Sequence, residues 1–246
     1  MVSIDLNCDM GEGMSNDAEL MAFISSTNIA CGYHAGDEDT MKRTVELALK
    51  KQVAIGAHPG FSDLEHFGRR ELNLNEAEFY HLVLDQIFIL KKITDSFQTK
   101  IHHVKPHGAM YNIAARNELL ARFIAQAVKD IDADFILYGL SGSHLISEGE
   151  SLGLKTASEV FADRTYQDDV SLTPRSQSNA LIENGNKCIE QVLQMIRQHS
   201  VTSVNKKVVP IEAETICIHG DGTHAVEFAR MIRDALKENH IDLKTI

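Results

Sequence analysis

Short apolar segments alternate with polar loops along the whole chain. In the first segment Val2, Ile4 and Leu6 alternate with polar residues, which is the two-residue period of a strand. Asp9 and Glu12 follow where this strand should end. Acidic side chains near a core are costly unless they pair, bind a metal or take part in chemistry. An edge strand with a polar turn would give the same pattern, so this segment alone leaves both interpretations open.

Six further segments repeat the order of apolar strand, polar motif and amphipathic helix. The predicted strands cover residues 2–6, 27–30, 53–57, 101–104, 135–138, 155–160 and 215–218. The predicted helices lie near residues 18–24, 41–49, 75–90, 119–128, 179–199 and 225–236. Asn75 with Glu78 predicts a capping box, and Thr223 is expected to cap the last helix. Residues 200–214 are expected to form a surface loop with an extra short strand.

The seven units carry no hairpin signal between strand-like runs, which favours parallel strands. Such strands form either an open doubly wound sheet or a closed barrel. In six of the seven units the polar residues follow the strand's C-terminal end. A barrel brings these ends to one face, whereas an open sheet spreads them along an edge. We therefore predict an α/β fold, a (β/α)7 barrel, as a single domain over residues 1–246.

Composition narrows the class of protein. A length of 246 residues suits one α/β barrel, and 43% apolar residues suit a globular core. The net charge of -11 opposes a nucleic-acid surface but allows a small anionic ligand. No apolar run reaches the roughly 18 residues of a membrane span. The cysteines are widely spaced and no leader pattern precedes the first strand, so we expect reduced thiols and a cytoplasmic location.

Four histidines each follow a predicted strand: His34, His58, His107 and His219. A single histidine is usually a surface or core residue, but a barrel would bring all four to one mouth. Imidazoles with a carboxylate from Asp9, Asp37 or Asp221 would suit a divalent metal. No pair has HxxxH spacing, so this prediction depends on the fold. The expected ligands are Asp9, His34 and His58.

Basic residues share these loops: Lys105, Arg69, Arg70, Arg164 and Arg175. Cations that converge in an acidic protein favour a carboxylate or phosphate ligand. The competing interpretation is ordinary ion pairing with Asp63, Asp163 or Glu159. No GxxxxGK[ST] loop is present, so a P-loop nucleotide site is excluded. Cys8 and Cys31 are expected to pack as small apolar groups.

Six motifs together resemble the LamB/YcsF family: IDLNCDMGEG, NIACGYHAGD, GAHPGFSDLEHFGRR, HVKPHGAMYN, EVFADRTY and IHGDGTHAV. The resemblance runs from about residue 3 to residue 229. One departure lies at Asp168-Asp169-Val170, where the family usually has Asp-Gly, so we expect this loop to turn differently. The resemblance implies a (β/α)7 barrel similar to the glycoside hydrolase/deacetylase superfamily.

The resemblance also implies an activity, the ATP-dependent hydrolysis of 5-oxo-L-proline (pyroglutamate) to L-glutamate. The chain would act as the A subunit of a 5-oxoprolinase with two further subunits, B and C, and with ATP as cosubstrate. For this reaction we expect Lys105 and His107 to contact the phosphoryl group, and Asp9 or Glu12 to act as general base. The expected substrate-binding residues are Asn7, Arg69, Arg70, Tyr111 and Arg164. A divalent metal, Mg or Zn, would assist.

Two other functions remain open. The first is a metal-dependent deacetylase or amidohydrolase that uses no ATP, with Asp9, His34 and His58 in the roles that such fold relatives give to similar residues. The second is a non-catalytic subunit that binds the lactam and passes it to a partner. A regulatory protein without a small-molecule site is the weakest alternative, because the charged residues at the strand ends would then have no purpose.

Overall fold

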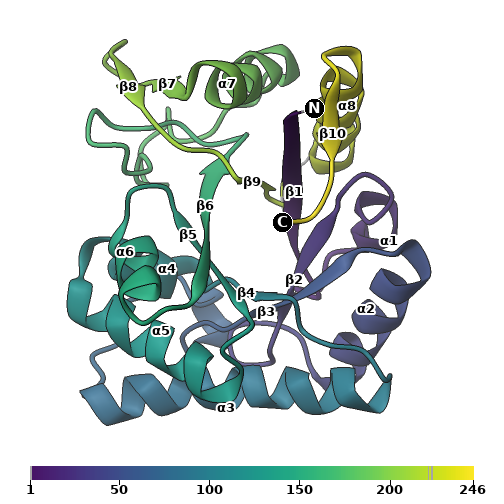
Figure 1. Ribbon diagram of the computed structural model, residues 1–246, viewed down its shortest axis with the longest axis vertical. Coiled ribbons are helices and arrows are strands. Elements are labelled where there is room, and N and C mark those ends of the chain that lie inside the picture. The colour runs from purple at the N-terminus through teal and green to yellow at the C-terminus, as the bar shows by residue number, and fades with distance from the viewer. Residues whose placement is uncertain (1, 221, 223) are drawn as a thin grey trace.

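A computed structural model describes residues 2–220, 222 and 224–246 and shows seven parallel strands closed into a barrel (Figure 1). The strands follow the order β1 (Val2–Met10), β2 (Ser26–Ala30), β3 (Ala54–His58), β4 (His103–Val104), β5 (Ile136–Leu140), β6 (Lys155–Phe161) and β9 (Thr215–Ile218). The ring closes where β1 pairs with β9, with Asp5 opposite Thr215. The barrel prediction is therefore confirmed, and the open sheet is excluded.

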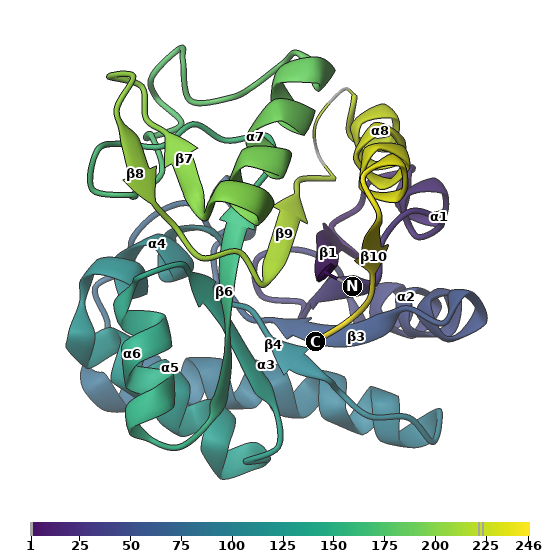
Figure 2. The same cartoon turned by 45° about the horizontal axis from the view of Figure 1, so that its top comes forward.

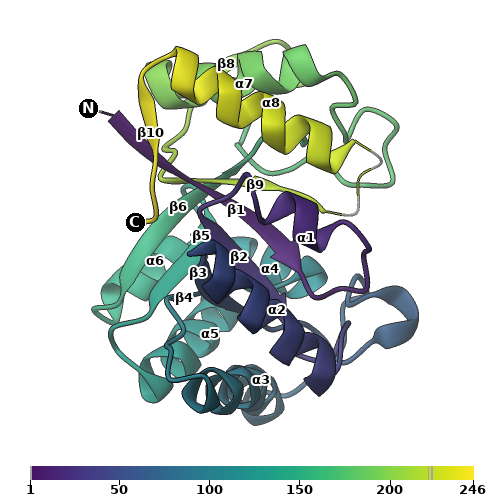
Figure 3. The same cartoon turned by 90° about the vertical axis from the view of Figure 1, so that its right-hand side faces the viewer.

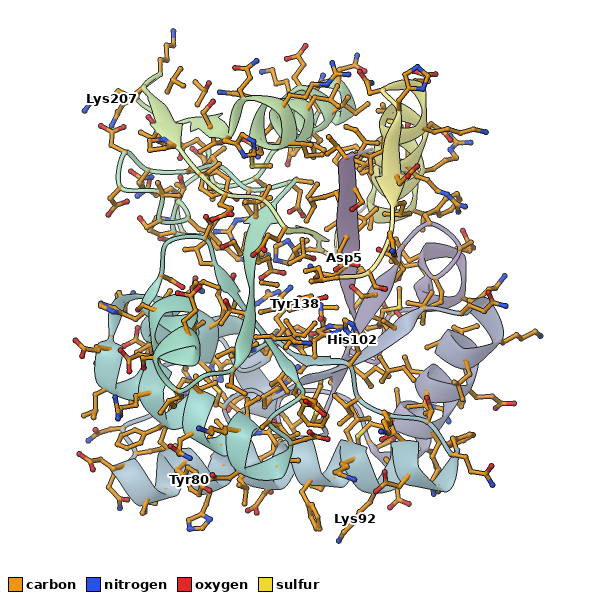
Figure 4. All side chains as sticks on the ribbon, viewed as in Figure 1. Asp5, Tyr80, Lys92, His102, Tyr138 and Lys207 are labelled. Carbon is orange, nitrogen blue, oxygen red and sulfur yellow. The ribbon has the colours of Figure 1, made fainter. Side chains whose placement is uncertain are left out.

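The alternation in β1 divides its side chains between two environments. Ile4, Leu6 and Cys8 are buried in the apolar core, together with residues of the surrounding helices. Asp5 and Asn7 instead reach side chains of β5 and β6 across the interior of the barrel. Figure 4 shows Asp5 and Tyr138 directed toward each other between the strands. The interior of this barrel is therefore polar, and the apolar core lies between the strands and the helices.

The helices cover the outside of the barrel (Figure 2). They are α1 (Asp17–Leu20), α2 (Glu38–Lys51), α3 (Glu76–Ser96), α4 (Gly108–Arg116), α5 (Glu118–Ile131), α6 (His144–Ser151), α7 (Gly185–Gln198) and α8 (Ala225–Glu238). The predicted capping box is confirmed, because Asn75 accepts from the Glu78 N–H and the Glu78 side chain accepts from the Asn75 N–H. α7 and α8 lie side by side (Figure 3). None of the described helices has the length and hydropathy needed to cross a bilayer.

Several boundaries differ from the predicted ones. The helix predicted from about residue 179 begins at Gly185, because Asn184 caps it by accepting the Lys187 N–H. Two helices follow β4 instead of one, since Asn117 caps a second helix through the Leu120 N–H. The helix α6 after the plain loop 141–143 had no counterpart in the prediction. The expected cap Thr223 lies outside the described residues.

The segment predicted as a loop with one extra strand contains two. Strands β7 (Ser200–Thr202) and β8 (Val208–Pro210) form an antiparallel hairpin outside the barrel. A final strand, β10 (Ile241–Leu243), pairs in parallel with the first residues of β1. A short 3-10 helix (Leu64–His66) lies in the loop after β3. These additions leave the barrel's C-terminal face open, and that face carries the polar motifs.

Candidate functional site

A cavity of about 760 Å³ opens at the C-terminal ends of the strands. Its wall includes the last residues of β1, β3 and β6, the loops that follow the strands, and α4: Asp9, Glu12, His58, Phe67, Arg69, Lys105, His107, Tyr111, Ser141, Ser143, Phe161, Arg164, Arg175 and His219. Asp9, expected after the first strand, lies within it because β1 extends to Met10. Parallel strands in a closed ring bring all these loops to one mouth. The geometric prediction that residues distant in the chain meet there is confirmed for these side chains.

Lys105 lies at the base of the cavity and is almost completely buried. Its Nζ is 3.0 Å from Asp9 Oδ1, 2.9 Å from Glu159 Oε1 and 3.2 Å from Asn7 Oδ1, and it also contacts the Cys217 sulfur at 3.0 Å. Burial lowers the pKa of Lys105, but the surrounding carboxylates outweigh burial and hold it well above its usual value. The ammonium is therefore charged and fixed in place.

Asp9 joins the lysine to the histidines. Its Oδ1 accepts from Lys105 and from Asn28 Nδ2 at 2.8 Å, and its Oδ2 lies 3.4 Å from His58 Nε2. Burial raises the pKa of Asp9, but His58 and Lys105 outweigh it and hold the pKa well below its usual range. Asp9 is therefore an ionised carboxylate that faces the cavity.

Beside Asp9 lies a group that we call the imidazole cluster: Glu12, His34, His58 and His107. His58 Nε2 is 2.9 Å from His107 Nδ1, and Glu12 Oε1 lies 3.3 Å from His107 Nδ1 and 3.4 Å from His34 Nε2. The rings of His34 and His107 stack at 3.9 Å. The three histidines are buried. This donor set is able to hold a metal ion.

Three arginines lie farther out on the wall. The Arg69 guanidinium lies 5.0 Å from the centre of the Phe67 ring. Arg164 is buried and donates to the backbone oxygens of Ala180 and Thr173. Burial and the nearby Arg175 lower the pKa of Arg164 to about 10. Two guanidinium groups that repel each other at the wall of a cavity favour an anion in that cavity.

Some expected site residues lie elsewhere. Arg70 pairs with Asp63 through two hydrogen bonds and is not among the described residues that line the cavity. Asn7 lies below the cavity, where its amide donates to Glu159 and Thr215. Asp37 caps α2 through the Thr40 N–H. Asp221 lies outside the described residues.

Two members of the site were missed by the sequence reasoning. Glu159 was weighed only as a salt-bridge partner, yet its position inside an apolar strand was a signal, since a lone acid there needs a partner. Asn28 occupies the equivalent polar position in β2 and bonds to both Asn7 and Asp9. By contrast, Cys8 and Cys31 are buried as expected, and burial raises the pKa of both thiols.

The LamB/YcsF family model matches residues 4–246. The chain belongs to the LamB/YcsF family. It is 49% identical over full length to a protein of Tolumonas auensis that is named as the A subunit of 5-oxoprolinase. It is also 52% identical to the protein of that name in Clostridium kluyveri, with 100% of this chain and 99% of the relative covered.

The fold of this LamB/YcsF chain is similar to those of several solved structures. The lactam utilization protein of Thermus thermophilus has a TM-score of 0.94 and 37% identity, with both chains fully covered. A family 4 carbohydrate esterase of Streptomyces lividans has a TM-score of 0.52 at 10% identity, with 98% and 91% of the two chains covered. The second likeness shows only the fold, a barrel of the deacetylase kind. The fold that the resemblance implied is thus confirmed.

Proposed function

We propose that this chain acts as the A subunit of a 5-oxoprolinase, which hydrolyses 5-oxo-L-proline to L-glutamate with ATP and with subunits B and C. The observation that supports this most strongly is the match over full length to relatives that carry the name of this subunit. The name of the Thermus thermophilus structure, a lactam utilization protein, agrees with it. The substrate is itself a five-membered lactam with a carboxylate.

The chemistry of the reaction calls for the groups that line the cavity. A lactam carbonyl is a poor electrophile. Transfer of a phosphoryl group from ATP to the lactam oxygen releases ADP and makes the ring carbon electrophilic. Water then adds to that carbon, and the C–N bond breaks as the ring nitrogen takes up a proton. A second water hydrolyses the resulting acyl phosphate to glutamate and phosphate. A fixed cation stabilises the charge on the phosphoryl oxygens. Lys105 is that cation in our proposal, and the Cys217 thiol, its weakest acceptor, is the contact that a phosphoryl oxygen would replace.

Asp9 is the proposed general base, because it is ionised and faces the cavity beside Lys105. His107 lines the cavity and, with Glu12 and His58 nearby, would help to position the water. A divalent ion held by neighbouring side chains would supply Lewis-acid polarisation of an oxygen when bound. Asn7 contributes by fixing the position of Lys105 rather than by touching substrate.

The substrate carboxylate requires a second cation, separate from Lys105. Arg69 and Arg164 both line the cavity and are the proposed partners. Arg70 becomes the weaker choice, because its guanidinium is engaged with Asp63. Tyr111 packs against Phe161 on the wall and would border the lactam ring.

The decisive experiment uses the Lys105→Ala variant reconstituted with its partner subunits. Release of phosphate that depends on 5-oxoproline, and formation of glutamate, should both fall at least about 100-fold because the fixed cation is lost. Lys91→Ala is the matched control, since Lys91 forms a surface pair with Asp95 on α3 and should leave both rates unchanged. Near-normal rates in Lys105→Ala would overturn the proposal.

Arg69→Ala provides a second measurement if Lys105→Ala fails to fold. Loss of a carboxylate partner should raise the KM for 5-oxoproline more than it lowers kcat. An unchanged KM would remove Arg69 from the substrate site and leave Arg164 as the carboxylate partner.

The barrel's likeness to carbohydrate esterases and its imidazole cluster favour one alternative, a metal-dependent deacetylase or amidohydrolase. Release of acetate from acetylated sugars by the isolated chain, without nucleotide, would support that function instead. Equilibrium binding of 5-oxoproline by the isolated chain without turnover, together with unchanged turnover by a complex that contains Lys105→Ala, would identify a non-catalytic lactam-binding subunit.

A further inference from the structure

Hydrogen bonds to backbone carbonyls fix the tautomers of two histidines in the imidazole cluster. His58 Nδ1 is 2.7 Å from the Lys105 carbonyl oxygen, and His107 Nε2 is 2.9 Å from that of Phe67. A carbonyl oxygen only accepts, so each of these nitrogens carries a hydrogen. In the neutral rings, His58 Nε2 and His107 Nδ1 then present lone pairs.

These two lone pairs point at each other. His58 Nε2 and His107 Nδ1 are 2.9 Å apart, and Glu12 Oε1, a third acceptor, is 3.8 Å from the first and 3.3 Å from the second. Three acceptors that converge inside a protein repel one another unless something positive lies among them. The positive species is either a proton or a metal ion.

The surroundings of His34 favour a metal ion over a proton. Its ring is 1% exposed, and neither of its nitrogens hydrogen-bonds to any residue that the structure describes. A buried imidazole whose two nitrogens lack hydrogen-bond partners is costly, and its Nε2 lies 3.4 Å from Glu12 Oε1, beside the other converging acceptors. A proton shared by His58 and His107 would leave this buried ring unsatisfied, whereas a metal ion would engage it.

The spacing of the donor atoms also fits a metal. Zinc in a tetrahedral site lies about 2.0–2.1 Å from its nitrogen and oxygen ligands, which places the ligand atoms about 3.3 Å from one another. Two donor distances match this value, 3.4 Å for His34 Nε2 to Glu12 Oε1 and 3.3 Å for His107 Nδ1 to Glu12 Oε1. The two from His58 Nε2, 2.9 Å to His107 Nδ1 and 3.8 Å to Glu12 Oε1, lie on either side of it. The His34 and His107 rings stack with nearly parallel planes, so one of them must turn when the ion binds. All four ligand atoms lie within 4.8 Å of one another.

Two glycines make room for the stacked rings. A Cβ at Gly60 would lie 2.7 Å from His34 Nδ1, and a Cβ at Gly68 would lie 2.8 Å from the His34 Cβ. Any other residue at either position would displace His34 from the cluster. The loop after β3 is therefore shaped around the imidazoles.

We propose that Glu12, His34, His58 and His107 together bind one divalent transition-metal ion, with zinc favoured by the three imidazoles and one carboxylate. Asp9 is outside this group of four: its Oδ1 is engaged by Lys105 and Asn28, and its Oδ2, 3.4 Å from His58 Nε2, is left to act as the base. The expected ligand set of Asp9, His34 and His58 is revised accordingly, with Asp9 left free to act as the base. This inference deepens the proposed function and rests on it only for the role of the ion.

The test begins with the full chain, stripped of metal and titrated with Zn²⁺ and Co²⁺. We expect stoichiometric binding by mass spectrometry and calorimetry, and a cobalt spectrum typical of tetrahedral nitrogen and oxygen ligands. Absence of stoichiometric binding would overturn the proposal and identify a shared proton as the positive species. This measurement needs no variant, so it does not depend on how substitutions fold.

Variants then locate the ion. His34→Gln and His107→Gln should each weaken zinc binding by about 100-fold or more, since each removes a direct ligand. His219→Gln is the matched control, because His219 lines the same cavity but hydrogen-bonds to Asp163. If His219→Gln loses the ion and His107→Gln keeps it, the ion belongs to the neighbouring group of Asp9, Cys217 and His219, and the proposal is wrong.

The outcomes for the ion and for the activity are separable. Zinc binding at the cluster with no turnover of 5-oxoproline in the reconstituted complex would sustain the metal site and remove the proposed function. Full turnover of 5-oxoproline by a complex that binds no metal would remove the metal site and sustain the proposed function.

Discussion

Asp163 and His219 form an ion pair at the wall of the cavity and connect the ends of two neighbouring strands. His219 Nδ1 is 2.9 Å from Asp163 Oδ1, and the Asp163 side chain is 13% exposed. Burial raises the pKa of Asp163, but His219 and Arg164 outweigh it and hold the pKa below its usual value. A carboxylate whose folded-state pKa is lowered stabilises the fold at pH values above its unfolded-state pKa of about 3.9. That contribution is lost as the pH falls through the folded-state value.

Asp163→Asn should therefore reduce stability in a pH-dependent way. At pH 7 we expect the free energy of unfolding to fall by about 1–2 kcal/mol, because a charged hydrogen bond in a largely buried site is lost. At pH values well below 3.9 the difference from the unaltered chain should shrink, since the carboxyl group is then protonated in both states. Urea unfolding of both proteins between low pH and pH 7 measures this difference in the free energy of unfolding. The same exchange at Asp234, exposed on α8, is the control, and an equal loss at every pH would contradict the explanation.

At the scale of elements, the long loop between β6 and α7 contains the most strained residue of the cavity wall. Val170 has a φ of 70°, a left-handed conformation that β-branched residues rarely adopt. The loop is held on both sides by the bridge between Tyr166 and Leu172. Val170 therefore occupies a position where the backbone favours glycine.

Val170→Gly should stabilise the protein by about 1 kcal/mol, the difference between the middle values of two opposing effects. Relief of a strain of about 1–3 kcal/mol outweighs the loss of about 0.5–1 kcal/mol that glycine brings through its greater freedom in the unfolded chain. Thermal unfolding measures the change. Val208→Gly, at an exposed position of β8, is the matched control and should destabilise instead. A lower melting temperature for Val170→Gly would show that the valine side chain contributes more than its strain costs.

At the scale of the whole molecule, the polar interior ties the barrel together. Asp5 accepts hydrogen bonds from Ser25, Ser26, Tyr138 and Thr215, which lie in or beside three other strands. Higher in the barrel, Asn7, Asn28, Glu159 and Lys105 continue this network toward the cavity. The residues that hold Lys105 are thus part of the same network that joins the strands.

Asp5→Ala should lower the free energy of unfolding by about 3–5 kcal/mol, because the hydroxyl groups of the three buried residues Ser26, Tyr138 and Thr215 lose their acceptor together with that of the half-buried Ser25. Tyr138→Phe removes only one of the four donors and should cost about 1–2 kcal/mol. Urea unfolding of both variants gives the comparison. Equal losses would show that the Asp5 carboxyl group adds nothing beyond its bond to Tyr138.

The local sequence pattern was sufficient to predict the strands and most helices. The periodicity of apolar residues and the capping motifs depend only on residues close together in the sequence. The capping box at Asn75 and the strand of residues 215–218 follow from such neighbours. Local pattern did not predict the first helix after β4 (α4), the helix α6 or the hairpin of β7 and β8. Their short segments lack a periodic signal, and packing against the barrel selects them.

The candidate site shows the same division. The sequence identified Lys105 and the histidines after the strands as members of one mouth, since position relative to strand ends is a local property. It offered ion pairing with Asp63 and Glu159 as the competing interpretation, but it did not indicate that Arg70 is the partner of Asp63 or that Glu159 reaches Lys105 across the barrel. Those choices depend on which side chains of different strands meet, which is set by the register of the closed ring.

The sequence by itself therefore determined the seven repeating units, the polar strand ends and membership of the LamB/YcsF family. Only the tertiary structure decided that Glu12 and His107 join His34 and His58 while Asp9 turns to Lys105. The physical reason is that hydrogen-bond partners and ligand distances are properties of atoms brought together by folding. Spacing along the chain fixes which face a residue occupies, but only closure of the barrel fixes its neighbours.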